Sequence, residues 1–253
     1  MQDIKRMNEL KIDNPAQRLL DILEAGKTQN RDQNCRSVWV FLLQAQKNNE
    51  QHLLSRLARV MELPGRIVQV REDHFSALRG KSTHWKTCVD KAFVSQTLNS
   101  TWQSFMQHID DRTFSELSML SDLFETRGAH AAIQSEEIEA LLERLTELRN
   151  DIREADLPAT MKTLLLKQLS QIQEALETYG ISGVEPVMDA VQSTLGLAVL
   201  NPEYRKEISK GTNSRFGEKI SDLLSDVANV VTVAGALPAL TVAVNTALTY
   251  IGQ

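Results

Sequence analysis

Residues that form turns and cross-links are scarce in this 253-residue chain. It contains 11 glycines and 6 prolines, fewer than the roughly 7% and 5% of ordinary proteins. Because turns between short strands depend on these residues, their shortage favours long helices. The two cysteines, Cys35 and Cys88, stand far apart and in no Cys-x-x-Cys pattern. We therefore expect neither a disulfide scaffold nor a four-cysteine zinc site.

The common enzyme signatures are missing as well. No Gly-x-Ser-x-Gly, His-Glu-x-x-His or Gly-x-Gly-x-x-Gly segment occurs. Gly80–Ser82 matches the end of a phosphate-binding P-loop, but Phe75 stands where the first glycine of that motif should be. We therefore expect no cofactor, no small-molecule substrate and, on balance, no enzymatic activity.

The charge balance also limits the function. Hydrophobic residues at 42% and charged residues at 24% are typical of a soluble globular protein, and the net charge of −5 argues against a protein that coats nucleic acid. Residues 1–134 carry a net charge of +2 and residues 135–253 a net charge of −7. The polar start, Met1–Arg6, has no apolar core of signal-peptide length, so we expect a cytoplasmic protein.

Apolar residues recur at helical spacing along most of the chain, which predicts an all-α, multi-helix bundle. Long helices are expected from Arg36 to Leu63, ended by Pro64–Gly65, and from Val89 to Ile109. The chain divides into three predicted segments. These are a mildly basic helical half (1–134), a helical hairpin with the helix after it (135–201), and amphipathic-to-apolar C-terminal helices (202–253).

The clearest pattern begins after Ser135, where apolar residues follow the three-four spacing of a heptad repeat. The spacing returns after Pro158 and continues to Gly180, which predicts a central antiparallel helical hairpin. Its apolar seam would join a protein partner or a second copy of the chain. The seam residues are Ile138, Leu141, Leu145, Leu148 and Ile152.

The C-terminal segment has no Asp, Glu, Lys or Arg after Asp226, which predicts an apolar helical hairpin interrupted at 235–238. Two interpretations stay open. The hairpin is buried in the fold or in an oligomer interface, or residues 227–253 associate with a membrane. The residues concerned are Val230, Val231, Leu237, Pro238, Leu240, Val244 and Leu248.

An alternative interpretation places nucleic-acid binding in the first half, because residues 31–91 carry a net charge of +5. Arg79 and His84 have the Arg-x4-His spacing and in this resemble HEPN-type helical ribonucleases. The resemblance implies a catalytic pair on a helix, whereas the residues between them are expected to form a loop. The basic residues that would contact phosphates are Arg66, Arg71, Arg79, Lys81 and Lys86.

His84 and Cys88 are four residues apart and could bind a metal from one helix face, but no further ligand is visible in the sequence. We therefore predict no metal site. The preferred function is a non-enzymatic helical interaction protein whose apolar C-terminal hairpin is buried or conditionally engages a membrane. The alternatives are an RNA-binding protein or ribonuclease, and a purely structural oligomeric bundle.

Overall fold

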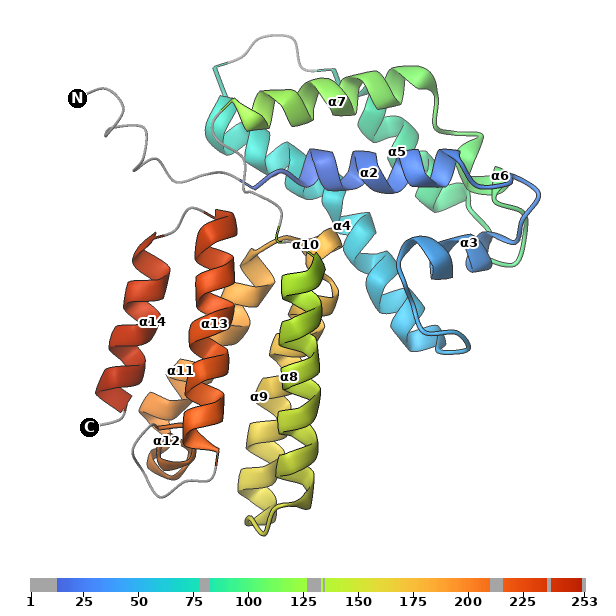
Figure 1. Ribbon diagram of the computed structural model, residues 1–253. Coiled ribbons are helices and arrows are strands. Elements are labelled where there is room, and N and C mark those ends of the chain that lie inside the picture. Colours follow the sequence, from blue (N-terminus) through green and yellow to red (C-terminus); the bar gives the residue numbers. More distant parts are fainter. Residues whose placement is uncertain are drawn as a thin grey trace. The chain divides into compact units, whose positions relative to one another are not determined.

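The computed structural model describes residues 13–77, 82–126, 133, 135–209, 216–235 and 238–251. This part of the chain contains thirteen helices and no strand, which confirms the all-α prediction. The helices fall into two units (Figure 1). The N-terminal unit comprises Ile12–Ala129 together with Gly180–Ser182, and the C-terminal unit comprises the rest of the chain.

Side-chain caps begin most helices of the N-terminal unit. The side-chain oxygens of Asn14, Asn34, Asn49 and Asp110 each accept the backbone N–H three residues further on, which satisfies donors that a helix start leaves free. The helices of this unit are α2 (Pro15–Lys27), α3 (Cys35–Leu42), α4 (Glu50–Phe75), α5 (His84–Ser95), α6 (Gln103–Met106) and α7 (Asp111–Glu125), with the last three residues of α10 (Tyr179–Ser182).

The prediction of one helix from Arg36 to Leu63 is wrong in two places. The chain leaves the helix after Leu42 and begins a new one at Glu50, because Asn49 caps α4. The new helix then continues through Pro64 to Phe75. Proline costs a backbone hydrogen bond there, but Leu63, Pro64 and Ile67 are all buried, and this burial outweighs the loss.

The predicted helix from Val89 to Ile109 is also divided. It ends at Ser95, and a short helix, α6, follows after a connection. Within the connection the backbone N–H of Cys35 donates to the carbonyl oxygen of Ser100 at 2.8 Å, and Asn34 pairs with Thr101 in an isolated bridge. These bonds to the start of α3 replace the helical bonds that residues 96–102 would have made.

Aromatic side chains form the centre of the N-terminal unit. The indole of Trp39 packs edge-on against Trp102 and Phe105, with ring centroids 5.0 and 5.1 Å apart. The indole N–H of Trp102 donates to the carbonyl oxygen of Gly26 at 2.8 Å, and that of Trp39 donates to Gln96. Both tryptophans therefore bury their rings without leaving a polar atom unsatisfied.

Three arginines hold the distant segment α10 in the N-terminal unit. Arg18 Nε donates to the carbonyl oxygen of Ile181 at 2.9 Å, and Arg66 Nη1 donates to that of Ser182 at 2.9 Å. Arg59 Nη1 donates to the Ser182 hydroxyl at 3.3 Å. These bonds, together with the burial of Ile181, explain why three residues from late in the chain belong to this unit.

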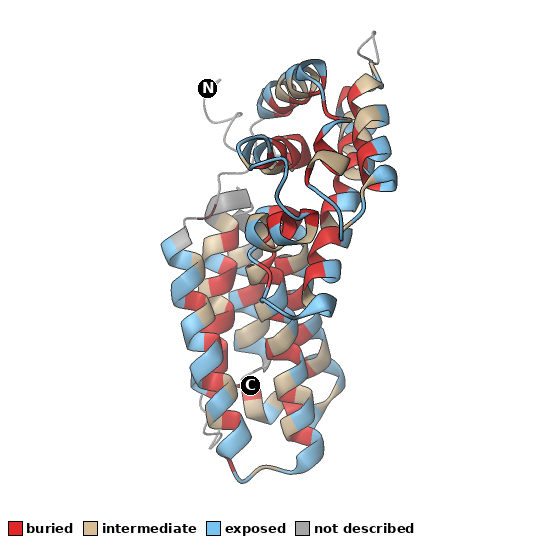
Figure 2. Ribbon diagram, turned by 90° about the vertical axis from the view of Figure 1, so that its right-hand side faces the viewer, coloured by how far each residue is buried: buried red, intermediate tan, exposed pale blue. Residues whose placement is uncertain are grey.

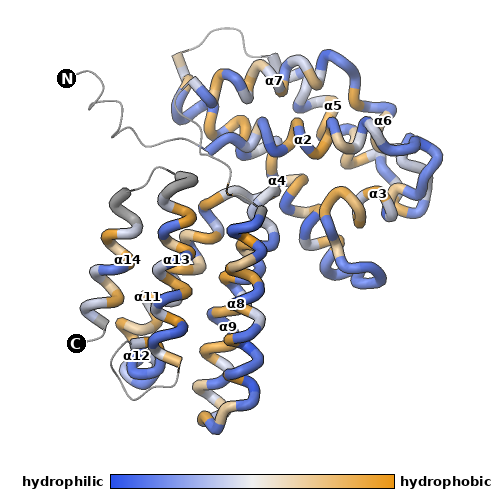
Figure 3. Tube along the Cα trace, in the orientation of Figure 1, coloured by the Kyte–Doolittle hydropathy of each residue, from blue (hydrophilic) through white to orange (hydrophobic). Residues whose placement is uncertain are grey.

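The C-terminal unit is a bundle whose helices bury one side and expose the other (Figure 2), and hydrophobic and hydrophilic residues alternate along these helices (Figure 3). The predicted seam residues Leu141, Leu145, Leu148 and Ile152 are all buried in its core, and Ile138 is partly buried against it. They are therefore covered by the unit's own helices. These are α8 (Ser135–Glu154), α9 (Ala159–Glu177), α11 (Glu185–Leu200), α12 (Pro202–Ile208), α13 (Gly217–Gly235) and α14 (Pro238–Ile251).

The apolar C-terminal residues lie on α13 and α14. Val231 and Val244 are buried in the core of the unit, and Val230 and Leu248 pack against it partly buried. Pro238 begins α14 and Leu240 lies within it, whereas Leu237 falls outside the described residues. Among the helices described, none combines the length and the hydropathy that a membrane span requires.

Candidate metal centre

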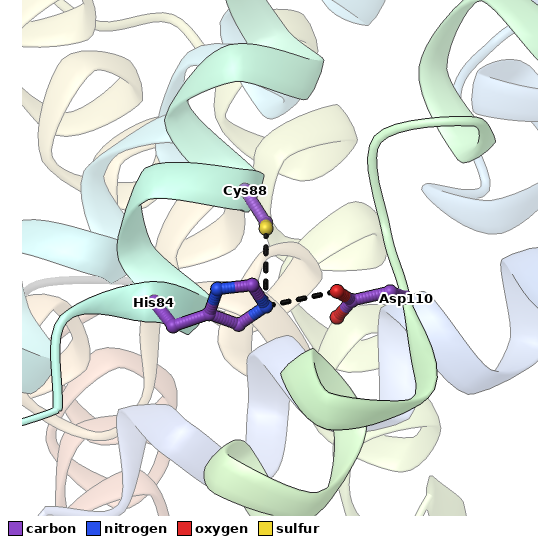
Figure 4. A group of neighbouring side chains, drawn as sticks. All are labelled: His84, Cys88 and Asp110. Atoms are coloured by element: carbon purple, nitrogen blue, oxygen red, sulfur yellow. Dashed lines mark hydrogen bonds and ion pairs between the residues drawn. The ribbon is translucent and has the colours of Figure 1, made fainter.

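Three side chains that commonly bind metals meet where α5 and α7 begin. His84 and Cys88 lie one turn apart on α5, and Asp110 is the residue before α7. Their donor atoms all lie within 4.8 Å of one another (Figure 4). In the part of the chain that the structure describes, no other three His, Cys, Asp or Glu side chains gather as closely.

Cys88 and Asp110 both approach the same nitrogen of the His84 imidazole. His84 Nε2 lies 2.9 Å from Asp110 Oδ2 and 3.5 Å from Cys88 Sγ. A nucleophilic thiol, histidine and carboxylate acting as a relay need the thiol and the carboxylate on opposite ring nitrogens. The arrangement here differs, because both partners share the same nitrogen. Instead, three side chains that could each offer one ligand atom to a cation lie within 4.8 Å of one another.

Asp110 divides its two oxygens between two tasks. Oδ1 accepts hydrogen bonds from the backbone N–H and the hydroxyl of Thr113, both at 2.8 Å, and so caps α7. Oδ2 faces His84. The hydrogen bonds from Thr113, with a smaller contribution from His84, lower the pKa of Asp110 to about 2. The carboxylate is therefore ionised at neutral pH and fixed in direction by the helix that it caps.

Glu116, on α7, fastens the beginning of α5. Its Oε1 accepts from the Ser82 hydroxyl at 2.7 Å and from Arg112 Nε at 2.8 Å, and its Oε2 accepts from the backbone N–H of Trp85 at 3.1 Å. Burial alone would raise the pKa of Glu116, but these hydrogen bonds outweigh it and lower the pKa. Thr83 makes no side-chain cap bond, so Glu116 supplies what the helix start lacks.

The donor set suits a transition metal. An imidazole nitrogen, a thiolate sulfur and a carboxylate oxygen are ligands of Zn²⁺, whereas Mg²⁺ and Ca²⁺ select oxygen atoms alone. Three protein ligands leave one tetrahedral position for water. The side chains of His84 and Asp110 are 31% and 52% exposed, so an ion can reach the site from solvent.

The sequence analysis identified two of the three candidate ligands, His84 and Cys88, but did not connect them with Asp110. Asp110 precedes an apolar-periodic helix, and this position marks it as a helix cap. Its approach to His84 depends on the packing of α5 against α7. That packing leaves no mark on local spacing, so the sequence alone does not bring Asp110 together with His84 and Cys88. The prediction of no metal site stays a prediction.

The other predicted site residues do not gather at this centre. Arg66 donates to the carbonyl oxygen of Ser182 and Lys86 pairs with Asp90 on α5, while Arg71 is partly buried on α4. Arg79 and Lys81 lie outside the described residues. The pairing of Arg79 with His84 therefore stays a prediction.

No protein family matches this chain, and neither a curated protein nor a solved structure does. Its function has to be argued from its own residues.

Proposed function

We propose that this chain is a helical Zn²⁺-binding protein whose N-terminal unit holds the ion with His84 Nε2, Cys88 Sγ and Asp110 Oδ2. The observation that carries the proposal is the convergence of these three atoms within 4.8 Å, from the starts of two helices. One carboxylate and one thiolate balance the two charges of the ion, and neutral imidazole adds none.

The proposed role of the ion is structural. Zn²⁺ would link the first turn of α5 to the residue that caps α7, beside the bonds already made by Glu116. Both oxygens of Glu116 accept hydrogen bonds that fasten the start of α5, so we assign that carboxylate a structural part as well. An ion bound to the folded state alone stabilises it by mass action, by about 2.7 kcal/mol at a hundredfold excess over Kd.

The test is a metal titration of the full chain after removal of bound ions with EDTA. We expect one Zn²⁺ per chain by competition with a chromophoric chelator, and a sulfur-to-cobalt charge-transfer band when Co²⁺ is used. Cys88→Ser should abolish that band and weaken Zn²⁺ binding by at least about tenfold. His84→Gln and Asp110→Asn should also weaken it.

Cys35→Ala is the matched control, since Cys35 is the other cysteine of the chain and lies buried in α3. This variant should bind Zn²⁺ and Co²⁺ as the wild type does. The proposal fails if the wild type takes up no Zn²⁺ at micromolar concentrations. It also fails if Cys35→Ala and Cys88→Ser lose binding equally.

For the C-terminal unit we propose that the apolar helices α13 and α14 stabilise the resting fold and meet a membrane only if α14 is released. The burial of Val231 and Val244 supports this, as does the 2.6 Å hydrogen bond between the hydroxyls of Thr232 and Thr241. Flotation with liposomes is the test. The full chain should stay unbound, and flotation without a trigger would favour constitutive membrane association instead.

A further inference from the structure

A second feature of the N-terminal unit lies between α3 and α4. The connection of residues 43–49 borders a cavity of about 1130 Å³ that opens to solvent. Small-molecule pockets commonly measure roughly 300–1,000 Å³. The cavity is therefore large enough for a ligand of several rigid groups, and none of the metal ligands lines it.

The connection is held in an uncommon backbone conformation. Gln44 and Asn48 adopt φ angles of 49° and 63°, the left-handed region that residues other than glycine seldom occupy. The guanidinium of Arg56, which is buried, donates to the carbonyl oxygens of Leu43 and Gln44 at 2.6 and 3.1 Å. A buried cation thus fixes the loop. Such conformations persist where the surroundings enforce them, and they concentrate at sites that clamp ligands.

The lining of the cavity combines an apolar floor with carboxamide groups. Leu53 and Ala45 are buried, whereas the ring of Phe41 is 65% exposed. The lining also includes five carboxamide side chains, those of Gln44, Gln46, Asn48, Asn49 and Asn99. Three of them already bond within the protein, because Asn49 caps α4 and donates to Gln46 Oε1, and Asn99 Oδ1 accepts from Arg36. A carboxamide carries both a donor and an acceptor, as a peptide group does.

The charges of the lining almost cancel. Arg36 Nη1 pairs with Glu50, and Arg36 Nη2 donates to Asn99 at 3.1 Å. Lys47 is the other charged residue of the lining. A phosphate or nucleotide site normally needs several converging cations, and here the arginine is already engaged. The charge pattern therefore selects an uncharged ligand with amide groups.

We propose that this cavity binds a short, uncharged peptide segment of a partner protein. An aromatic or large aliphatic side chain of the segment packs on the exposed ring of Phe41, and its main-chain amides pair with the carboxamides of Gln44 and Asn48. This binding is independent of the metal centre and goes beyond the proposed Zn²⁺ function. It gives the N-terminal unit a recognition surface that is already formed before the partner arrives.

The experiment is a titration of the full chain, labelled with ¹⁵N, followed by amide chemical shifts. The probe is N-acetyl-phenylalanine methylamide at millimolar concentrations. N-acetyl-alanine methylamide is the control for the anchoring side chain, and adenosine monophosphate is the control for a nucleotide. We expect the phenylalanine probe to shift signals of residues 43–49 and to bind roughly tenfold more tightly than the alanine probe.

Phe41→Ala should weaken this binding about fivefold or more without changing the thermal unfolding of the chain. Met119→Ala is the matched variant, because Met119 is 70% exposed in the same unit and lies outside the cavity. It should leave binding unchanged, and so should EDTA. The proposal is overturned if adenosine monophosphate shifts the same signals more strongly, if residues 43–49 do not respond, or if both variants weaken binding equally.

Discussion

Replacing Asp110 by asparagine should remove the negative charge beside His84 and keep the side-chain cap of α7. Asparagine and aspartate cap helices about equally well, whereas alanine at this position costs about 0.5–2 kcal/mol. The hydrogen bond with His84, which is an ion pair only when the imidazole is protonated, joins side chains that are 31% and 52% exposed. Such exposed pairs contribute at most about 1 kcal/mol. Asp110→Ala should therefore lose about 1 kcal/mol more free energy of unfolding than Asp110→Asn.

The loss in Asp110→Asn should depend on pH. The pKa of Asp110 falls from an ordinary 3.8 to about 2 on folding, chiefly through Thr113. A carboxyl with a lowered pKa stabilises the fold above its unfolded pKa, and this stabilisation is lost as the pH falls towards its folded pKa. The full shift would correspond to about 2.4 kcal/mol, which solvent screening of a half-exposed group reduces to roughly 1 kcal/mol. The difference in free energy of unfolding between wild type and Asp110→Asn should reach its full value at pH 6 and be nearly absent at pH 2.

Urea unfolding followed by tryptophan fluorescence is the appropriate assay, because all three tryptophans of the chain lie in the N-terminal unit. The proteins are compared in EDTA, so that metal binding does not contribute. Asp111→Asn is the control, since its carboxylate is 94% exposed and pairs with Lys27 at the surface. The reasoning is refuted if Asp110→Asn is as unstable as Asp110→Ala, or if its deficit is unchanged at pH 2.

Four further substitutions and one labelling experiment test other parts of the structure. Gly26→Ala would place its Cβ 2.9 Å from a buried indole carbon and should cost about 1–3 kcal/mol in urea unfolding. Gly65→Ala meets no atom within 4 Å inside a helix and should stabilise the N-terminal unit by about 0.5–1 kcal/mol. Leu145→Ala should destabilise the C-terminal unit by about 2–5 kcal/mol in circular dichroism, with no change of sedimentation, whereas Leu145→Glu should unfold it. Ellman's reagent should modify Cys88 in the folded chain. It should reach Cys35 only on unfolding, because Cys35 is buried and burial raises the pKa of its thiol. Bound Zn²⁺ should protect Cys88 from the reagent.

The helices were predictable where local spacing and burial agree. The heptad spacing after Ser135 identified Leu141, Leu145 and Leu148 as one apolar side, and the structure buries all three. The same spacing does not say which surface covers that side. A partner's helix and the unit's own helices leave identical patterns in one sequence, so the intramolecular packing had to come from the structure.

Prediction failed where a tertiary contact overrides a local rule. Pro64–Gly65 normally ends a helix, yet α4 continues because the apolar residues around the proline are buried. Asp110 was recognisable as a helix cap, but its contact with His84 requires two helices to pack side by side. Such packing depends on residues far apart in the chain, which periodicity and capping rules do not relate to one another.

The membership of α10 in the N-terminal unit has a consequence for synthesis on the ribosome. About fifty residues, 130–179, must be made after Ala129 before Gly180–Ser182 can join Arg18, Arg59 and Arg66. At roughly 5–20 residues per second, this interval lasts about 2.5–10 s. The nascent N-terminal unit therefore stays incomplete while residues 130–179 of the C-terminal unit are translated. Its last stabilising bonds form only when α8 and α9 have already emerged, at a moment when the C-terminal unit still lacks residues 183–253.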